Sequence, residues 1–377
     1  MNHPGRRRGC CCMTSHRHPV IESVEVSSFT IPTDTPEADG TYEWGSTTLV
    51  VVEVRGGGHT GIGYTYADEA AATLIRGKLA EVVAGRSVLD VPAAWQAMVR
   101  SIRNLGRPGI CSMAIAAVDS ALWDLKAKLL GLPLVMLLGV AKESVAAYGS
   151  GGFTSYSSEQ LRKQLGGWVA GGLRMVKMKI GAHPEQDVAR VWEARQAIGD
   201  AQLFVDANGA YTRKQALHFA DRFSEFGVAW FEEPVSSDDL EGLRLVRDRA
   251  PAGMAIAAGE YGYDLFYFRR MLAAGAVDVL QIDATRCAGI TEFLRVAALA
   301  ASHNLKISAH TAPTLHTHLC CAVADSVHVE YFHDHARIEQ MLFEGAIRPL
   351  RGELRPDLSR PGLGIELKRA DARRYAA

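Results

Sequence analysis

The 377-residue sequence has no run of 18 apolar residues and almost no net charge. A helix that crosses a bilayer needs about 20 predominantly apolar residues, so we expect no membrane span. The formal net charge is −1, from 41 Lys and Arg against 42 Asp and Glu. This balance gives no electrostatic reason to expect binding to nucleic acid or to an anionic membrane surface.

The seven cysteines lack the paired spacing of a zinc site. Residues 10–12 form a cysteine triplet near the N-terminus, and the other four cysteines are scattered. A disulfide framework is unusual in a chain of this length, so a reducing cytoplasm is the simplest expected compartment. The basic N-terminal stretch also lacks the apolar segment of a secretory signal, and we expect residues 1–18 to be a disordered tail.

Residues 19–140 are expected to form an α+β domain. Alternating, strand-like residues fill positions 20–66, and helical periodicity follows from 67 to 140. The segment SMAIAAVDSALWDLKAKLLG (112–131) spaces its apolar residues as a helix does. Gly131 and Pro133 then supply a stop signal.

Eight short β-like runs alternate with helix-like segments from about residue 145 to residue 332. The runs are VAAYGSGG, MVKMKIG, LFVDANG, VAWFEEP, MAIAAGE, VDVLQID, LKISAH and VHVEYF. Strands alternating with helices predict a parallel sheet, and eight such units favour a closed (β/α) barrel over an open sheet. We therefore predict an α/β fold with a TIM-type barrel over residues 141–350. Residues 351–377 leave the pattern and are expected to return to the N-terminal domain.

Seven of the eight runs carry an ionisable residue at or near the C-terminal end, spaced 20 to 28 residues apart. These residues are Lys179, Asp206, Glu232, Glu260, Asp283, His310 and Glu330. The C-terminal ends of barrel strands converge on one mouth, where active sites lie. A single acidic strand end would be explained as a helix cap or surface charge, but seven in register predict a site.

Three carboxylates from successive strands predict a metal site. Asp206, Glu232 and Glu260 would repel one another in the barrel mouth unless a cation neutralised them. Oxygen ligands alone favour a hard ion, so we predict one Mg²⁺. Glu233 has the opposite strand parity to Glu232 and is expected to point away and pair elsewhere.

Lys177 and Lys179 lie two positions apart in a predicted strand, so both point to one face. Two adjacent ammonium groups lower the pKa of at least one of them. The alternative is an exposed edge strand with a solvated basic face. If the strand is internal, Lys177 is predicted to keep Lys179 partly neutral and to bind a substrate oxygen, and Lys179 is predicted to act as a base.

Asp283 and His310 end neighbouring strands on the other side of the carboxylates. A carboxylate behind an imidazole fixes the tautomer of the imidazole and raises its basicity. A base on each flank of a metal suits removal of a proton α to a carboxylate, with an enediolate held by positive charge. Glu330 is predicted to donate a hydrogen bond to that intermediate if its pKa is raised.

The combined motifs, Lys177-x-Lys179, VDANG, FEEP, AAGE, QID and SAH, resemble the mandelate racemase subgroup of the enolase superfamily from about residue 20 to 365. The resemblance implies an N-terminal capping domain over the barrel mouth and the roles given above for the strand-end residues. It also implies that Asn208 lies close to metal and substrate, and that the chain assembles as a homo-oligomer around a small-molecule carboxylate substrate.

The resemblance implies that capping-domain loops contact substrate. The two candidates are TDTPEADGTYEW (33–44) and GIGYTY (61–66), with Tyr42, Trp44 and Tyr64 as contact residues. Packing within the capping domain explains these aromatic residues equally well. Arg286 and His316 are candidates for binding a distal hydroxyl or carboxylate, although a structural ion pair is the favoured role for Arg286.

The sixth strand carries Asp283 and no lysine, which disfavours the muconate-cycloisomerase-like and dipeptide-epimerase-like branches. The remaining candidates are a dehydratase of acid sugars, a racemase or epimerase of 2-hydroxy acids, and a noncatalytic ligand-binding member. Dehydration is favoured because the resembling subgroup contains more dehydratases and because residues 33–46 are polar. A phosphate-binding barrel is disfavoured because HTAPTLHTH and YFHDHARIE offer no glycine-rich cradle.

Overall fold

The computed structural model describes residues 18–377. The tail predicted for residues 1–18 therefore lies outside the described residues, apart from His18. Among the residues described, no helix combines the length and the apolar character that crossing a bilayer requires.

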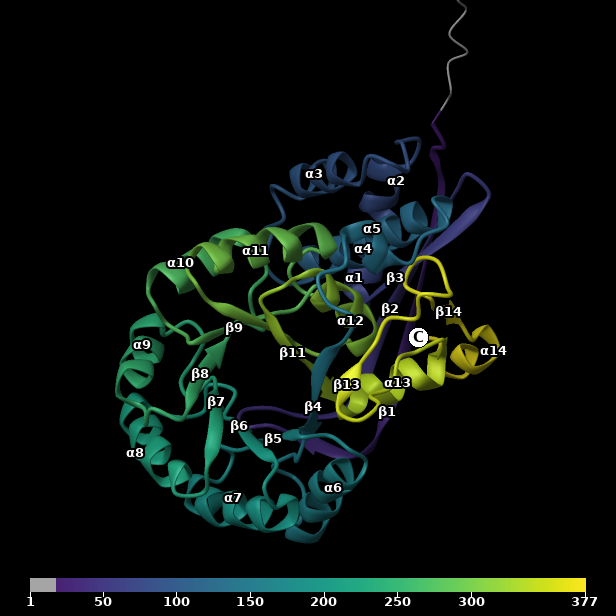
Figure 1. Cartoon of the computed structure of the whole chain (residues 1–377). Coiled ribbons are helices and arrows are strands. Elements are labelled where there is room, and N and C mark those ends of the chain that lie inside the picture. Colours follow the sequence, from purple (N-terminus) through teal and green to yellow (C-terminus); the bar gives the residue numbers. More distant parts are fainter. Residues whose placement is uncertain (1–17) are drawn as a thin grey trace, which may run out of the picture.

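The N-terminal part of the chain forms an antiparallel sheet followed by helices (Figure 1), as predicted. The strand order is β1-β2-β3, with β1 at Ile21–Ala38, β2 at Glu43–Gly56 and β3 at His59–Tyr66. The following elements are α1 (Glu69–Leu74), the π-helical η1 (Ile75–Leu79), α2 (Ala80–Val83), α3 (Val91–Ser101), α4 (Ile110–Leu129) and α5 (Leu134–Leu138). Gly131, just beyond α4, has a φ of 67°, a conformation that favours glycine and ends helices.

The two segments predicted as capping loops are largely strands. Residues 33–44 include the end of β1 and the start of β2, with a tight turn in which the Tyr42 carbonyl accepts from the Asp39 N–H at 2.9 Å. Residues 61–66 belong to β3, which packs directly on α4. A Cβ on Gly61 or Gly63 would lie 2.2 Å from a carbonyl oxygen of α4, so only glycine permits this approach.

In the described part of the chain, eight parallel strands form a closed barrel. They are β4 (Val145–Gly151), β5 (Met175–Lys179), β6 (Gln202–Asp206), β7 (Val228–Glu232), β8 (Ala255–Ala258), β9 (Val279–Ile282), β10 (Lys306–Ala309) and β11 (Ser326–Phe332). Strand β11 pairs in parallel with β4 and closes the ring. Each strand overlaps one of the eight predicted runs, so the predicted barrel with an N-terminal capping domain is confirmed.

Helices surround the barrel on its outer side (Figure 1). They are α6 (Ser158–Ala170), α7 (Pro184–Ile198), α8 (Arg213–Ser224), α9 (Leu240–Arg249), α10 (Leu265–Ala273), α11 (Ile290–Ser302), α12 (Pro313–Ala322) and α13 (His333–Leu342). Two of them begin with a capping box, Ser157 with Gln160 and Thr212 with Gln215, in which side chains satisfy the free N–H groups of the first turn.

Strand β5 lies between β4 and β6, so the alternative of an exposed edge strand is wrong. Val176, Met178 and Ile180 pack in the main hydrophobic core. Lys177 and Lys179 have the opposite parity, are buried and point towards the carboxylates of neighbouring strands. The pleat of one internal strand thus places two lysines inside the barrel.

The C-terminal segment contacts both parts of the molecule. Strand β13 (Glu353–Leu354) pairs antiparallel with β4, and β12 (Phe343–Glu344) pairs with β14 (Glu366–Leu367). After α14 (Arg369–Ala372) and η2 (Arg373–Tyr375), the N–H of Ala377 donates to the Ser28 carbonyl of β1 at 3.1 Å. The last residues therefore reach the capping sheet.

Candidate active site

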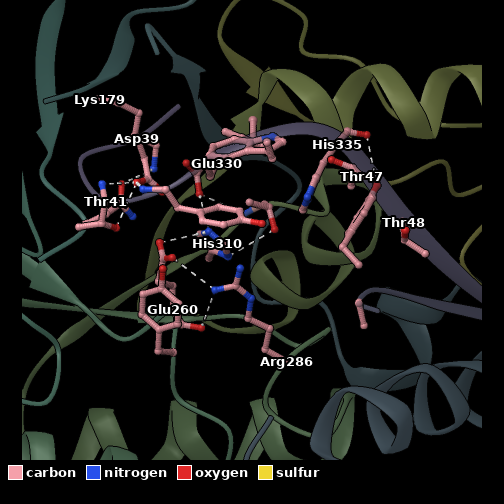
Figure 2. Close-up of a pocket in the computed structure, with 18 of the residues that line it drawn as sticks. Asp39, Thr41, Thr47, Thr48, Lys179, Glu260, Arg286, His310, Glu330 and His335 are labelled. Atoms are coloured by element: carbon pink, nitrogen blue, oxygen red, sulfur yellow. Dashed lines mark hydrogen bonds and ion pairs between the residues drawn. The ribbon is translucent and has the colours of Figure 1, made fainter. Parts of the chain in front are cut away.

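A pocket of about 500 Å³ lies between the C-terminal ends of the barrel strands and the β1–β2 hairpin (Figure 2). We call its barrel side the floor, formed by Lys179, Asn208, Glu260, Tyr261, Arg286, His310, Thr311 and Glu330. We call the remainder the wall, formed by Asp39, Thr41, Tyr42, Trp44, Ser46, Thr47, Thr48, Tyr66, Ala67, Asp68, Phe332 and His335.

The β1–β2 hairpin is fastened to the segment that follows β4. The Thr154 N–H donates to the Ala38 carbonyl at 2.9 Å, and the Thr154 hydroxyl donates to the Asp39 carbonyl at 2.7 Å. The Ser155 hydroxyl donates to the Pro36 carbonyl at 2.7 Å. These bonds hold the hairpin over the barrel mouth.

Three carboxylates at the ends of β6, β7 and β8 offer oxygens that all lie within 4.8 Å of one another: Asp206, Glu232 and Glu260. All three side chains are buried. Burial and the neighbouring Asp206 raise the pKa of Glu232 well above its usual value. Glu260 Oε2 is buried and has no partner in hydrogen-bonding geometry. Three carboxylates crowded together in this way fit a divalent cation such as Mg²⁺.

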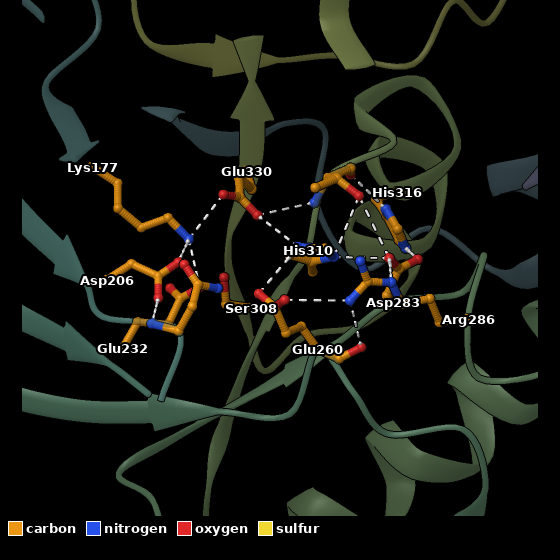
Figure 3. Close-up of polar contacts among 12 residues, drawn as sticks. Lys177, Asp206, Glu232, Glu260, Asp283, Arg286, Ser308, His310, His316 and Glu330 are labelled. Atoms are coloured by element: carbon orange, nitrogen blue, oxygen red, sulfur yellow. Dashed lines mark hydrogen bonds and ion pairs between the residues drawn. The ribbon is translucent and has the colours of Figure 1, made fainter. Parts of the chain in front are cut away.

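Lys177 is not among the residues that line the pocket, and its predicted contact with a substrate oxygen stays a prediction. Its Nζ is 2.6 Å from Glu232 Oε1, 2.8 Å from Glu330 Oε1 and 3.3 Å from Asp206 Oδ2 (Figure 3). Its side chain is fully buried. One ammonium group thus neutralises part of the charge of three carboxylates.

Lys179 reaches the pocket, with its Nζ 2.5 Å from Asp206 Oδ2 and 3.1 Å from Asn208 Oδ1. Burial lowers the pKa of Lys179, Asp206 raises it, and Lys177 lowers it. The neighbouring carboxylates raise the pKa of Lys179 by more than burial and Lys177 lower it. Among the protein's own groups, the pKa of Lys179 therefore lies above its usual value. The predicted effect of Lys177 is present but is outweighed.

Asp283 and His310 form a close pair on the other side of the floor. Asp283 Oδ2 is 2.8 Å from His310 Nδ1, and Asp283 Oδ1 accepts from the N–H and the hydroxyl of Thr285, each at 2.7 Å. Burial raises the pKa of Asp283, but the hydrogen bond and charge of His310 outweigh burial and hold it below its usual value. His310 Nε2 is directed to the pocket, 3.2 Å from Glu260 Oε2.

Glu330 is an acceptor in this structure, so the raised pKa on which its predicted role as a hydrogen-bond donor depends is not found among the protein's own groups. Burial raises the pKa of Glu330, but Lys177, His310 and Lys179 together outweigh burial and lower the pKa to about 2. Its Oε2 accepts from the Thr311 N–H at 3.2 Å. Figure 3 shows Glu330 between Lys177 and His310, where an ionised carboxylate stabilises both.

Backbone strain is concentrated at the strand ends of the floor. Asn208, Glu233, Thr311 and Ala312 have φ values of 45°, 37°, 52° and 39°, in the region that side chains other than glycine seldom adopt. Glu233 was predicted to pair elsewhere, but its buried Oε1 has no hydrogen-bond partner, so no pairing is seen at that atom. Strain of this kind persists where the surrounding structure fixes the position of functional groups.

Comparisons with known proteins agree with this geometry. Residues 26–139 match the N-terminal domain of mandelate racemase and muconate lactonizing enzyme, and residues 160–372 match the enolase C-terminal domain-like family. The chain belongs to the mandelate racemase/muconate lactonizing enzyme family. The family resemblance predicted from the motifs is confirmed.

Relatives in this family are acid-sugar dehydratases and cycloisomerases. The chain is 31% identical to L-talarate/galactarate dehydratase of Salmonella typhimurium, covering 83% of this chain and 81% of that protein. It is 33% identical to 3,6-anhydro-alpha-L-galactonate cycloisomerase of Streptomyces coelicolor, covering 82% of this chain and 88% of that protein.

Solved structures share the whole fold. A mandelate racemase/muconate lactonizing enzyme-like protein from Rubrobacter xylanophilus has 55% identity and a TM-score of 0.93, covering 95% of this chain and 100% of that chain. The Salmonella dehydratase, liganded with Mg and L-lyxarohydroxamate, has 28% identity and a TM-score of 0.88, covering 100% of this chain and 96% of that chain. Magnesium is thus the cofactor found in related structures, in agreement with the prediction from three carboxylates.

Of the residues predicted to contact substrate, Asn208, Tyr42, Trp44 and Arg286 all line the pocket. Arg286 also forms the favoured ion pairs, with its Nη1 3.3 Å from Glu260 Oε1 and its Nε 3.7 Å from Asp283 Oδ2. Trp44 Nε1 donates to Glu37 Oε2 at 3.0 Å, so its indole is fixed in the wall.

Tyr64 and His316 do not line the pocket. The Tyr64 hydroxyl donates to Glu339 Oε1 at 2.7 Å in the core, which supports packing as its role. His316 Nε2 accepts from the Ala284 N–H at 2.9 Å, and its Nδ1 is 2.7 Å from the Thr311 carbonyl. Both ring nitrogens of His316 therefore contact backbone groups. The predicted substrate contact of His316 is wrong.

Most residues of the wall were not predicted from the sequence. Asp39, Thr47, Thr48 and Asp68 lie in or after strands of the capping sheet, and His335 lies in the first turn of α13. Of these five residues, only Asp39 lies in the polar segment that the sequence indicated as a substrate-contacting loop. The other residues carry no local pattern, because their positions depend on how the capping sheet docks on the barrel.

Proposed function

We propose that the protein catalyses Mg²⁺-dependent removal of the proton α to a carboxylate, and that the reaction is dehydration of an acid sugar to a 2-keto-3-deoxy acid. The observation that carries this proposal is that Lys179 and His310, from different strands, line one pocket together with Glu260. Dehydratases among the relatives support the reaction class.

Asp206, Glu232 and Glu260 would hold the cation. When bound, Mg²⁺ supplies positive charge that stabilises the negative charge developing on the substrate carboxylate. Lys177 contributes a fixed positive charge to the same region from beneath, because its ammonium contacts Glu232 and Glu330.

Lys179 and His310 are the proposed acid–base pair. One of them takes the proton from C2, and the C3 hydroxyl then leaves as water after receiving a proton from an acid. The resulting enol tautomerises to the 2-keto acid, so substrate becomes product plus one water. Asp283 holds His310 through Nδ1, which leaves Nε2 to exchange the proton on the pocket side.

The alternative reaction is racemisation or epimerisation of a 2-hydroxy acid. It starts with the same proton removal and then returns a proton to the opposite face of C2, for which a second group is required. The presence of both Lys179 and His310 supports this alternative too, and cycloisomerases occur among the relatives. A noncatalytic ligand-binding protein is the third possibility.

The purified protein with Mg²⁺ should be tested against a panel of acid sugars in D₂O, following 2-keto product and deuterium at C2. We expect keto product from at least one acid sugar. Deuterium at an inverted C2 without keto product would instead establish the isomerase. A Lys179→Ala/His310→Asn double variant should lose both signals, and retained C2 exchange in that variant would contradict the assigned bases.

The homo-oligomer and the cytoplasmic location stay predictions. Light scattering on the purified protein measures the first of them directly.

A further inference from the structure

Resting on the proposed function, we propose that the pocket selects acid sugars with a single carboxylate and rejects diacids of the same length. The inference follows from the charges that line the pocket away from the metal ligands. It narrows the substrate to acids whose distal end is a neutral, hydroxylated chain.

Both basic Lys and Arg side chains that line the pocket are already paired within the floor. Lys179 contacts Asp206 at 2.5 Å. Arg286 lies between Glu260 and Asp283, at 3.3 and 3.7 Å. Among the described residues, no other lysine or arginine lines the pocket. A second substrate carboxylate at the wall would therefore find no lysine or arginine there.

The wall instead presents carboxylates and hydroxyls. Asp39 Oδ1 accepts from the N–H groups of Thr41 and Tyr42 at 2.6 and 2.7 Å, which holds the hairpin turn. Asp68 Oδ1 accepts from the Ala70 N–H at 2.8 Å and caps α1. Both carboxylates are bound to backbone N–H groups, so neither negative charge is balanced by those contacts. Like charges brought together at a binding surface cost several kcal/mol.

The wall offers neutral partners for hydroxyl groups on the side of the pocket where Figure 2 shows His335, Thr47 and Thr48. His335 is 8% exposed, and its Nδ1 is buried without a hydrogen-bond partner. Its ring stacks on Tyr66 with 3.4 Å between ring centroids. His335 lines the pocket, and a sugar hydroxyl can donate to or accept from a neutral side chain of this kind.

The carboxylates of the wall and its neutral hydrogen-bonding groups both favour a monoacid over a diacid. A diacid must bring its distal carboxylate out of water into a wall that holds Asp39 and Asp68 and no lysine or arginine, whereas a monoacid exchanges hydroxyl–water contacts for hydroxyl–protein contacts. A site that hydrogen-bonds one substrate group strongly rejects an analogue that leaves buried polar groups unpaired.

The test compares matched acid sugars that have the same chain length and configuration and differ only in a terminal CH₂OH or carboxylate. With the Mg²⁺-loaded protein and keto product as the readout, we expect kcat/KM to be at least about 100-fold higher for the monoacid. Equal or faster turnover of the diacid would overturn the inference and leave the proposed function intact. Absence of keto product from every acid would overturn both.

A double variant tests the cause. Asp39→Asn/Asp68→Asn removes two negative charges but retains the oxygens that cap the turn and α1, since asparagine is also a good helix cap. We expect the ratio of kcat/KM for the diacid to kcat/KM for the monoacid to rise about 10-fold. The control is Asp221→Asn/Asp238→Asn, which removes the same charge from exposed positions outside the pocket. Equal effects of the two double variants would contradict the inference.

Discussion

The floor and the wall of the pocket are built differently. Ionisable groups of the floor contact one another directly, as Arg286 and His310 contact Glu260, and most of them are buried. The wall consists mostly of hydroxyl and aromatic residues, and several of them are partly exposed, with Tyr42 at 69%. The floor is positioned by the register of one closed sheet, whereas the wall depends on the docking of two domains. We therefore expect changes in the floor to affect the chemical step for every substrate, and changes in the wall to affect which substrate binds.

The largest expected effect comes from the floor. Lys179→Ala should lower kcat by at least about 10³-fold for all accepted acids, because proton transfer by a positioned side chain contributes about 10²–10⁴-fold. Steady-state kinetics on two acids checks this prediction. Lys163→Ala, at an exposed position of α6, is the matched control and should retain activity. A fall in kcat for only one of the two acids would show that Lys179 affects which substrate is used, as we expect of wall residues, and would contradict this prediction.

Removal of the cation should also act on the floor. A chelator is expected to abolish keto product, and Mg²⁺ should restore it. Thermal unfolding supplies an independent measurement, because a ligand that binds only the folded state stabilises it by about 2.7 kcal/mol at 100 times its Kd. Melting temperature should therefore rise with added Mg²⁺. Glu260→Gln should weaken this rise, and an unchanged rise in that variant would argue against Glu260 as a ligand.

A smaller effect is expected from the wall. His335→Phe keeps an aromatic ring for the stack on Tyr66 but removes the ring nitrogens of a residue that lines the pocket. We expect kcat/KM for the best acid to fall about 10-fold, the value of roughly one neutral hydrogen bond, with the loss mainly in KM. Kinetics with saturating and limiting substrate separates the two parameters. A fall in kcat as large as that of Lys179→Ala would place His335 among the chemical groups.

The smallest expected effect is on the pH dependence of stability, and it comes from Glu37, which accepts a hydrogen bond from Trp44 of the wall. Burial raises the pKa of Glu37 to about 9, Asp334 and Asp34 add to it, and Trp44 and Arg337 oppose it. The folded protein thus binds a proton that the unfolded chain releases near pH 4.5. This difference makes stability fall as pH rises from about 4.5 to about 9.

Glu37→Gln should remove that fall, because the amide is neutral and its oxygen can still accept from Trp44. We expect the variant to melt within about 1 °C of the parent at pH 5 and higher at pH 8, by roughly 2–4 °C for each kcal/mol gained. Calorimetry at both pH values makes the comparison. Identical pH slopes for the two proteins would contradict the raised pKa of Glu37.

Much of the floor could be predicted from the sequence because the barrel repeats one unit. Each strand ends near an ionisable residue, and parallel strands bring those ends to the same edge, so the strand pattern alone predicts that Asp206, Glu232 and Glu260 meet. Pleat parity likewise predicts that Lys177 and Lys179 share one face. The ionisation of Glu330 could not be predicted, because it depends on a 2.8 Å contact with Lys177, two strands away.

The hairpin resembles a loop in the sequence for a physical reason. Strand β1 is at the edge of its sheet, where proline is tolerated because one side of the strand needs no hydrogen-bond donor. Pro32 and Pro36 and the polar residues around them therefore have the composition of a loop although they belong to a strand. The residues of the wall that follow, such as Thr47 and Thr48, have no sequence pattern that indicates the pocket.

The anchoring of the β1–β2 hairpin has a consequence for how sequences of this kind can diverge. The three bonds from Thr154 and Ser155 end on the carbonyl oxygens of Pro36, Ala38 and Asp39. Every amino acid supplies a carbonyl oxygen, so the side chains of the hairpin can be replaced without loss of its anchor. Exposed side chains of the hairpin, such as Tyr42, can therefore change by mutation or recombination while these three bonds remain.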